Sequence, residues 1–182
     1  GLALAVQTGF AAVVGLIVAR EFGRGEETDG LFAAYSVYVV VILAANAIRV
    51  VVMPPLSRAR EEQRLGAEVA AYAVTVAAVG VPLLLAGVVA AEPISWLLTG
   101  SGPETARAAA TDALPWMLLG GILQLYAGLA ASALAALDDY GLSAAGYALG
   151  SAAGLALILL RADADGIAAV GWGMALNGAV AL

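Results

Sequence analysis

Long runs without charged residues divide the chain into six apolar segments. They cover residues 1–19, 30–48, 69–91, 113–137, 140–160 and 166–182. A helix needs about 20 mostly apolar residues to cross the hydrocarbon core of a bilayer, and the runs reach or approach that length, since the second continues past Arg49 to Pro54. The runs do not alternate with polar residues, which disfavours a membrane β-barrel. The pattern predicts spanning helices over approximately 2–20, 30–53, 68–91, 111–137, 140–160 and 165–182.

The connections between these segments are short and polar. They lie at 20–30, 54–67, 92–112, 138–141 and 161–165. Short connections make sequential helices antiparallel neighbours, so residues 1–182 are expected to form one all-α bundle of six transmembrane helices. The chain begins at Gly1 inside one apolar run and stops at Leu182 inside another, and we expect it to be part of a longer transporter-like protein.

Composition supports a membrane protein and narrows its chemistry. Apolar residues make up 63% of the chain and charged residues 12%, against roughly 45–50% and ~25% in soluble domains. The net charge of −6 argues against nucleic acid as a partner, because nucleic-acid binding needs a basic face. The absence of Cys and His excludes disulfides, thiolate chemistry and the common zinc and Ser–His sites. We therefore expect no enzyme activity, catalytic residue, metal site or cofactor.

The basic residues give a weak indication of orientation. Connections 20–30, 92–112 and 161–165 are expected on one side of the membrane, and connections 54–67 and 138–141 on the other. Arg58, Arg60 and Arg64 are concentrated in connection 54–67. Because Lys and Arg are enriched in cytoplasmic loops, this connection is expected to face the cytoplasm.

The second predicted span carries polar side chains along one stripe. At 100° per residue the stripe occupies about 80° of arc, and it consists of Tyr35, Tyr38, Ile42, Asn46, Arg49 and Met53. An Arg at the centre of a membrane helix costs about 2.5–3.5 kcal/mol, so the stripe is expected to line a cavity that meets an anionic or sugar-bearing substrate. Alternatively, Arg49 extends to the headgroups and Asn46 bonds a neighbouring helix.

Two glutamines, Gln7 and Gln124, lie within the first and fourth spans. They are further candidates for the substrate cavity, although such amides often bond across helices with no other role.

Small residues recur every four positions in the fourth and fifth spans. Gly128 lies in the fourth, and Gly146, Gly150 and Gly154 lie in the fifth. Small residues at this spacing let helix backbones approach closely. We therefore expect the fourth and fifth spans to pack against each other through Gly128 and Gly150.

Acidic residues near the predicted helix ends have structural explanations. Glu68 and Asp112 are expected in the first turns of their helices, where a negative charge complements the helix dipole. The pair Asp138 and Asp139 is either a cation or proton site or an exposed turn, and the following Tyr140-Gly141 favours the turn.

Three stretches of the sequence resemble one transporter family. Residues 18–32, VAREFGRGEETDGLF, resemble the A-x-x-F-G-x-G-x-x-x-D-A-F signature of the MviN-type lipid II flippases, with Phe22, Gly23, Gly25 and Asp29 at its central positions. Residues 53–57 resemble the family's V-P-x-L-S, and residues 166–173 its G-I-x-A-L-A-W-G. These flippases belong to the multidrug/oligosaccharidyl-lipid/polysaccharide exporter superfamily. The resemblance implies two six-helix lobes around a central cavity, of which this chain is the N-terminal one.

The resemblance implies a flippase of the bacterial cytoplasmic membrane. The expected substrate is a lipid-linked saccharide, either a lipid II-like peptidoglycan precursor or another polyprenyl-linked glycan, and the expected partners are the bilayer and the second lobe. The chain departs from the family in lacking its Arg pairs in the first and second spans, which questions lipid II as the cargo. The alternatives are an antiporter driven by a coupling cation, which requires an intramembrane carboxylate, and a non-transporting paralogue that binds a partner.

Overall fold

The computed structural model describes residues 9, 12–23 and 25–182. Every regular element in this part of the chain is a helix. Helical residues 12–17 lead into a short π-helix, and the elements in chain order are η1 (Val18–Phe22), α2 (Glu26–Glu61), α3 (Leu65–Val89), α4 (Ala91–Thr99), α5 (Glu104–Ala136), α6 (Tyr140–Asp165) and α7 (Ala168–Ala181). About half of the predicted first span (2–20), including Gln7, lies outside the described residues.

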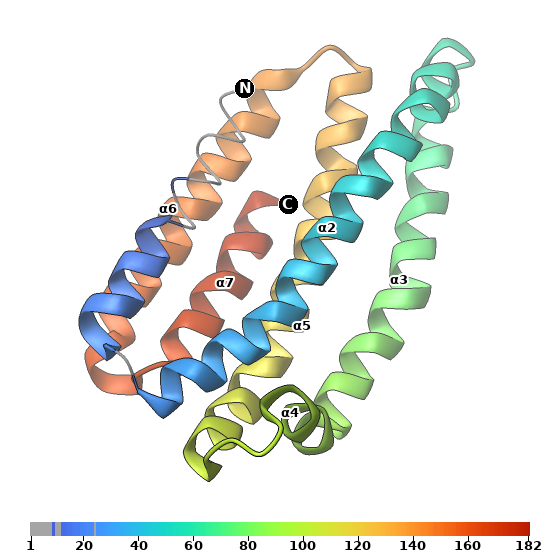
Figure 1. Cartoon of the computed structure of the whole chain (residues 1–182). Helices are drawn as coiled ribbons and strands as arrows, with labels where there is room; N and C mark the ends of the chain where they lie inside the picture. The colour runs from blue at the N-terminus through green and yellow to red at the C-terminus, as the bar shows by residue number, and fades with distance from the viewer. Residues whose placement is uncertain (1–8, 10–11, 24) are drawn as a thin grey trace.

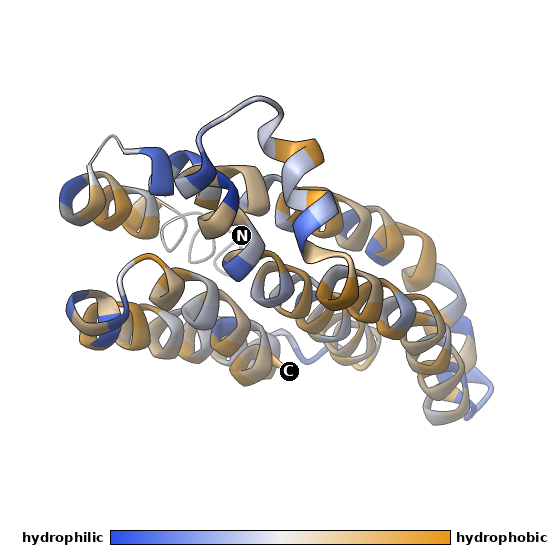
Figure 2. Cartoon of the chain, turned by 90° about the horizontal axis from the view of Figure 1, so that it is seen from below, coloured by the Kyte–Doolittle hydropathy of each residue, from blue (hydrophilic) through white to orange (hydrophobic). Residues whose placement is uncertain are grey.

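Four of the described helices, α2, α3, α5 and α6, are long and apolar enough to cross a membrane. Hydrophilic residues concentrate near the helix ends and connections, and hydrophobic residues along the helices (Figure 2). The remaining apolar helix, α7, is shorter. Its 14 residues extend roughly 21 Å at 1.5 Å per residue, which is less than the ~30 Å hydrocarbon core of a bilayer. The predicted all-α membrane fold is thus confirmed for the described residues, whereas the count of six spans stays a prediction.

The central helix of the bundle is α5, which contacts α2, α3, α4 and α7. Buried residues make up 61% of its most apolar stretch, against 11% in α3. α2, α5 and α7 run in one direction and α3 and α6 in the other (Figure 1). Alternate connections therefore lie at the same end of the bundle, as predicted.

An ion pair joins the two connections at one end of the bundle. Arg60 lies 2.7 Å from the carboxylate of Asp138, and its guanidinium also donates to the carbonyl of Ala136 at 2.7 Å. Nearby, Arg64 bonds the carboxylate of Glu62, which raises the pKa of the Arg64 guanidinium above its usual value. Arg60 and Arg64 are thus each paired with an acidic residue.

The second helix is longer than the sequence predicts. The pair Pro54 and Pro55 was expected to end it, but α2 continues to Glu61. Leu56 and Ala59, which follow the prolines, are almost fully buried, and Leu56 packs with Leu129 of α5. This tertiary packing offsets the backbone hydrogen bonds that the prolines remove.

The predicted connection 92–112 is also largely helical. It contains α4, which lies across one end of the bundle (Figure 1), and the first turns of α5. Asp112 was therefore placed wrongly in a first turn: the acidic residue of the first turn of α5 is Glu104. Glu68 does lie in the first turn of α3, as predicted.

The Asp138–Asp139 pair forms an exposed turn, as the sequence favoured. Asp138 has a positive φ of 63°. The side chain of Asp139 caps α6, because its Oδ1 accepts hydrogen bonds from the backbone of Gly141 and Leu142, each at 3.1 Å. Both aspartates thus have a local structural role.

The expected pairing of the fourth and fifth spans through Gly128 and Gly150 is wrong. Gly146, Gly150 and Gly154 of α6 face α7: a Cβ atom on Gly150 would lie 2.5 Å from the carbonyl oxygen of Asn177. Gly128 of α5 instead faces Arg49 of α2. The physical reason is that α7 lies between α5 and most of α6 (Figure 1), so the glycines of α6 pack against the later helix.

Candidate functional site

Six polar side chains on four helices are buried or half-buried within the bundle. We call them the polar row, and they are Tyr35, Tyr38 and Arg49 of α2, Gln124 of α5, Tyr147 of α6 and Asn177 of α7. Four of the six, all but Tyr35 and Arg49, are buried. The row includes the predicted candidates Tyr35, Tyr38, Arg49 and Gln124.

Arg49 is the charged member of the polar row, and its side chain lies over Gly128 of α5. Its Cδ and Cγ atoms are 3.3 and 3.5 Å from the position that a Cβ on Gly128 would take. The absence of a side chain at Gly128 thus makes room for the arginine. The guanidinium interacts electrostatically with Tyr147 of α6, and no hydrogen bond or ion pair joins it to another described residue.

The position of Arg49 along α2 is well inside the helix. It lies 12 residues (61 minus 49) before the end at Glu61, which is roughly 18 Å at 1.5 Å per residue. The side chain is half-buried against α5. Because α2 extends past the prolines, Arg49 is farther from the helix end than the sequence suggests.

Three tyrosines form the aromatic part of the polar row. The rings of Tyr35 and Tyr38 stack with their centroids 5.5 Å apart. Tyr38 and Tyr147 are both buried, and Tyr147 packs against Ala127 and Ala131 of α5. The sequence reasoning missed Tyr147, although the buried residues of α6 recur at helical spacing and place it on the same face as Gly154 and Ile158.

The two buried amides contact each other across helices. The Nε2 atom of Gln124 lies 3.5 Å from Oδ1 of Asn177, a long and therefore weak hydrogen bond. This is the cross-helix contact that the sequence left open as the alternative to a cavity role for Gln124. Asn46, the remaining candidate of the α2 stripe, is exposed.

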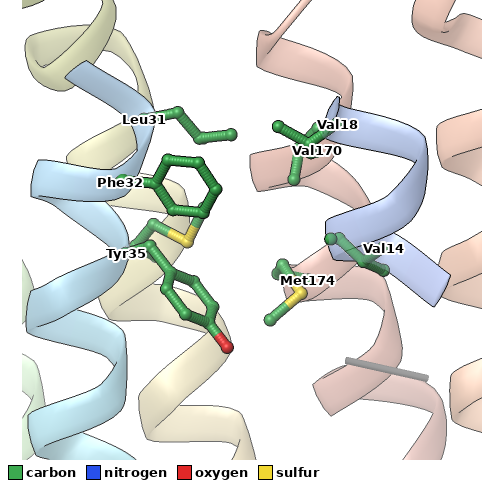
Figure 3. Close-up of a pocket in the computed structure, with 9 residues that line it drawn as sticks. Val14, Val18, Leu31, Phe32, Tyr35, Val170 and Met174 are labelled. Carbon is green, nitrogen blue, oxygen red and sulfur yellow. The ribbon is translucent and has the colours of Figure 1, made fainter. Parts of the chain in front are cut away.

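An apolar cavity of about 70 Å³ adjoins the polar row at Tyr35. In Figure 3, Leu31, Phe32 and Tyr35 of α2 face Val14 and Val18 across the cavity, together with Val170 and Met174 of α7. Met117 of α5 and Gly15 complete the lining. Tyr35 thus belongs both to this cavity and to the polar row.

The residues of the predicted family-motif loop connect η1 to α2. Phe22 is half-buried against the main core, and Gly23 adopts φ 64° and ψ −150°, a conformation open essentially only to glycine. Gly25 is the N-cap of α2, and its carbonyl accepts the backbone N–H of Asp29 at 3.1 Å. The side chain of Asp29 is exposed in the first helical turn.

The described residues include no group of three or more His, Cys, Asp or Glu side chains that could hold a metal ion. A comparison of the chain with protein-family models, curated proteins and solved structures found no match. The family resemblance therefore stays a prediction.

Proposed function

We propose that the chain is one helical lobe of a membrane exporter that moves a lipid-linked saccharide across the bacterial cytoplasmic membrane by alternating access. The substrate is a lipid II-like precursor or another polyprenyl-linked glycan. The family resemblance at residues 18–32, 53–57 and 166–173 supports this proposal, together with the all-α membrane fold. In the proposed protein the second lobe faces this lobe across the central cavity.

The main support for the proposal is the guanidinium of Arg49, which lies within a membrane helix without a hydrogen-bond partner among the described residues. A guanidinium within a membrane helix is unfavourable unless it meets a partner or water, and that of Arg49 bonds no described residue. It faces the polar row instead of projecting away from the bundle. A guanidinium presents parallel N–H donors that match the oxygens of a phosphate, so the phosphate of a lipid-linked saccharide is its proposed partner.

The charge distribution disfavours an antiporter for organic cations. Such a transporter needs a carboxylate within the membrane, and residues 30–60 of α2, 69–89 of α3, 113–136 of α5 and 140–162 of α6 contain neither Asp nor Glu. The charged member of the polar row is cationic, which favours an anionic substrate.

The test is a transport assay on the complete gene product that contains this sequence. A fluorescent polyprenyl-diphosphate saccharide in proteoliposomes reports the rate of flipping. We expect Arg49→Ala to slow flipping about 10-fold or more, because a hydrogen bond to a charged group contributes about 1.5–3 kcal/mol. Arg58→Ala is the matched control, since Arg58 is on the same helix but exposed beyond the prolines. Equal rates for the two variants would contradict the proposal.

The identity of the saccharide is tested by complementation. The complete gene product is expressed in cells depleted of their own lipid II flippase, and survival is scored. Rescue would identify a lipid II-like cargo despite the missing Arg pairs. Failure with the protein present in the membrane would favour another polyprenyl-linked glycan.

A further inference from the structure

A second pocket, of about 650 Å³, opens where the chain enters α2. The start of α2, which lines it, lies at the end of the bundle opposite connection 54–67 (Figure 1). We call this pocket the entry pocket, and it is lined by Ala19, Gly23, Gly25, Glu26, Thr28, Asp29 and Phe32. Its size falls within the range of ligand sites for small molecules, about 300–1,000 Å³.

One polar side chain in the entry pocket is buried without a partner. Thr28 is only 6% exposed, and its hydroxyl has no hydrogen-bond partner. A buried hydroxyl without a hydrogen bond is unfavourable by about 1–3 kcal/mol. Because Thr28 lines the entry pocket, a ligand bound there is a candidate partner for this hydroxyl.

The charge of the entry pocket selects the kind of ligand. The carboxylates of Glu26 and Asp29 line it, and Glu26 already accepts a hydrogen bond from the hydroxyl of Thr105. Ionised carboxylates are negatively charged, so they repel a phosphate. They only accept hydrogen bonds, so they favour a ligand whose hydroxyl groups donate. Ca²⁺ and Mg²⁺ also prefer oxygen ligands, but each needs about six or more of them. Two carboxylates in a pocket of this size are too few to bind such a cation.

Phe32 lines the apolar cavity beside Tyr35 (Figure 3) and also lines the entry pocket. The Phe32 side chain is 49% exposed, so its ring offers an apolar surface toward the entry pocket as well. A pocket of hydroxyl acceptors therefore lies directly beside a cavity lined by Val14, Val18 and Met174. This arrangement matches a molecule in which a sugar is attached directly to a hydrocarbon chain.

We infer that the entry pocket binds the saccharide hydroxyls of a glycolipid, while the apolar cavity on the other side of Phe32 takes the first methylene groups of its hydrocarbon. The inference rests on the proposed function and deepens it, because it assigns the sugar to a site separate from Arg49. With connection 54–67 in the cytoplasm, the entry pocket lies on the outer side, where the saccharide arrives after crossing.

The test is calorimetric titration of hexyl β-D-glucoside, below its micellar concentration, into the full chain in lipid nanodiscs. Glucose alone and 1-hexanol alone are titrated as the two halves of the probe. Asp29→Asn and Thr28→Val keep side-chain shape while removing an acceptor charge and a hydroxyl. Glu27→Gln is the matched control, because Glu27 lies exposed in the same helical turn and does not line the entry pocket.

We expect hexyl glucoside to bind more tightly than either half and each of the two pocket variants to weaken it about 10-fold. Glu27→Gln should leave the Kd unchanged. Thr28→Val should melt no lower than the parent chain, since it removes a buried unpartnered hydroxyl, so weaker binding by this variant cannot reflect unfolding. Probe binding that is undetectable, or equal in all variants, would overturn the inference.

Two further outcomes separate this inference from the proposed function. If Na⁺ or Ca²⁺ displaces the probe, and Asp29→Asn weakens the binding of that cation, the entry pocket is a cation site. The inference is then overturned, while the role of Arg49 stands. If the glucoside binds as expected but Arg49→Ala leaves flipping unchanged, the inference is supported and the proposed function fails.

Discussion

The contact between α6 and α7 makes a prediction whose magnitude follows from the backbone geometry. In the substitution Gly150→Ala the new Cβ would lie 2.5 Å from the carbonyl oxygen of Asn177 and 3.0 Å from the backbone nitrogen of Ala181. Close carbon–oxygen contacts in proteins begin at about 3.3 Å. The two helices must therefore separate by roughly 0.8 Å where their backbones now meet.

Such overpacking destabilises a protein by about 1–3 kcal/mol, while the change from Gly to Ala in a helix interior contributes up to ~1 kcal/mol in the opposite direction. Gly66→Ala is the matched control, because a Cβ on Gly66 of α3 would meet nothing within 4 Å. Comparing the two variants removes most of the propensity effect and leaves the overpacking. At about 2–4 °C per kcal/mol for a chain of this size, Gly150→Ala should melt about 2–12 °C below Gly66→Ala.

The assay is thermal unfolding of the detergent-extracted chain, followed by the fluorescence of its tryptophans. Gly154→Ala should behave like Gly150→Ala, since its Cβ would lie 2.5 Å from the carbonyl oxygen of Gly173. Gly146→Ala should be milder, because the corresponding distance to the carbonyl oxygen of Ala181 is 3.1 Å. Equal melting temperatures for Gly150→Ala and Gly66→Ala would refute the close approach of α6 and α7.

Two further predictions concern the turns at the end of the bundle that carries connection 54–67. Asp139→Ala removes the cap of α6 and should destabilise the chain by about 0.5–2 kcal/mol in the same unfolding assay; an unchanged melting temperature would show that the cap contributes nothing. A double-mutant cycle of Arg60→Ala and Asp138→Ala should give a coupling of about 0.2–1 kcal/mol, because the two side chains are 45% and 74% exposed, and added salt should reduce it. A coupling that salt does not change would contradict an exposed ion pair.

Local sequence patterns predict the elements whose structure depends on local chemistry. The apolar runs predict α3, α5 and α6 because a lipid-embedded helix is apolar along its length, and the turn at Asp138–Asp139 follows from residues that favour turns and caps. The Arg49 stripe could be found in the same way, since its members recur at helical spacing on one helix.

Features that depend on distant residues could not be predicted. Pro54 and Pro55 indicate a helix end, but the burial of Leu56 against Leu129 of α5 extends α2. The glycines of α6 indicate that another helix packs closely against it, but their spacing does not specify which helix. In the structure that helix is α7. The entry pocket likewise depends on Phe32 serving two cavities at once, which a linear sequence does not show.

The central claim is that the side of α2 carrying the polar stripe faces an aqueous substrate path while its other side faces lipid. The chain has no Cys, so a single introduced cysteine can report on each side. Asn46 and Val51 are both exposed on α2 and lie about 140° apart at 100° per residue. The measurement is labelling of Asn46→Cys and Val51→Cys in membranes with a charged, membrane-impermeant thiol reagent.

We expect the reagent to label Asn46→Cys rapidly and to leave Val51→Cys unlabelled. Adding a soluble phosphate-bearing saccharide should slow the labelling of Asn46→Cys, since Arg49 lies one helical turn away. If both cysteines stay unlabelled while a membrane-permeant reagent labels them, the stripe is dry, Arg49 is a structural residue, and the transport account is wrong.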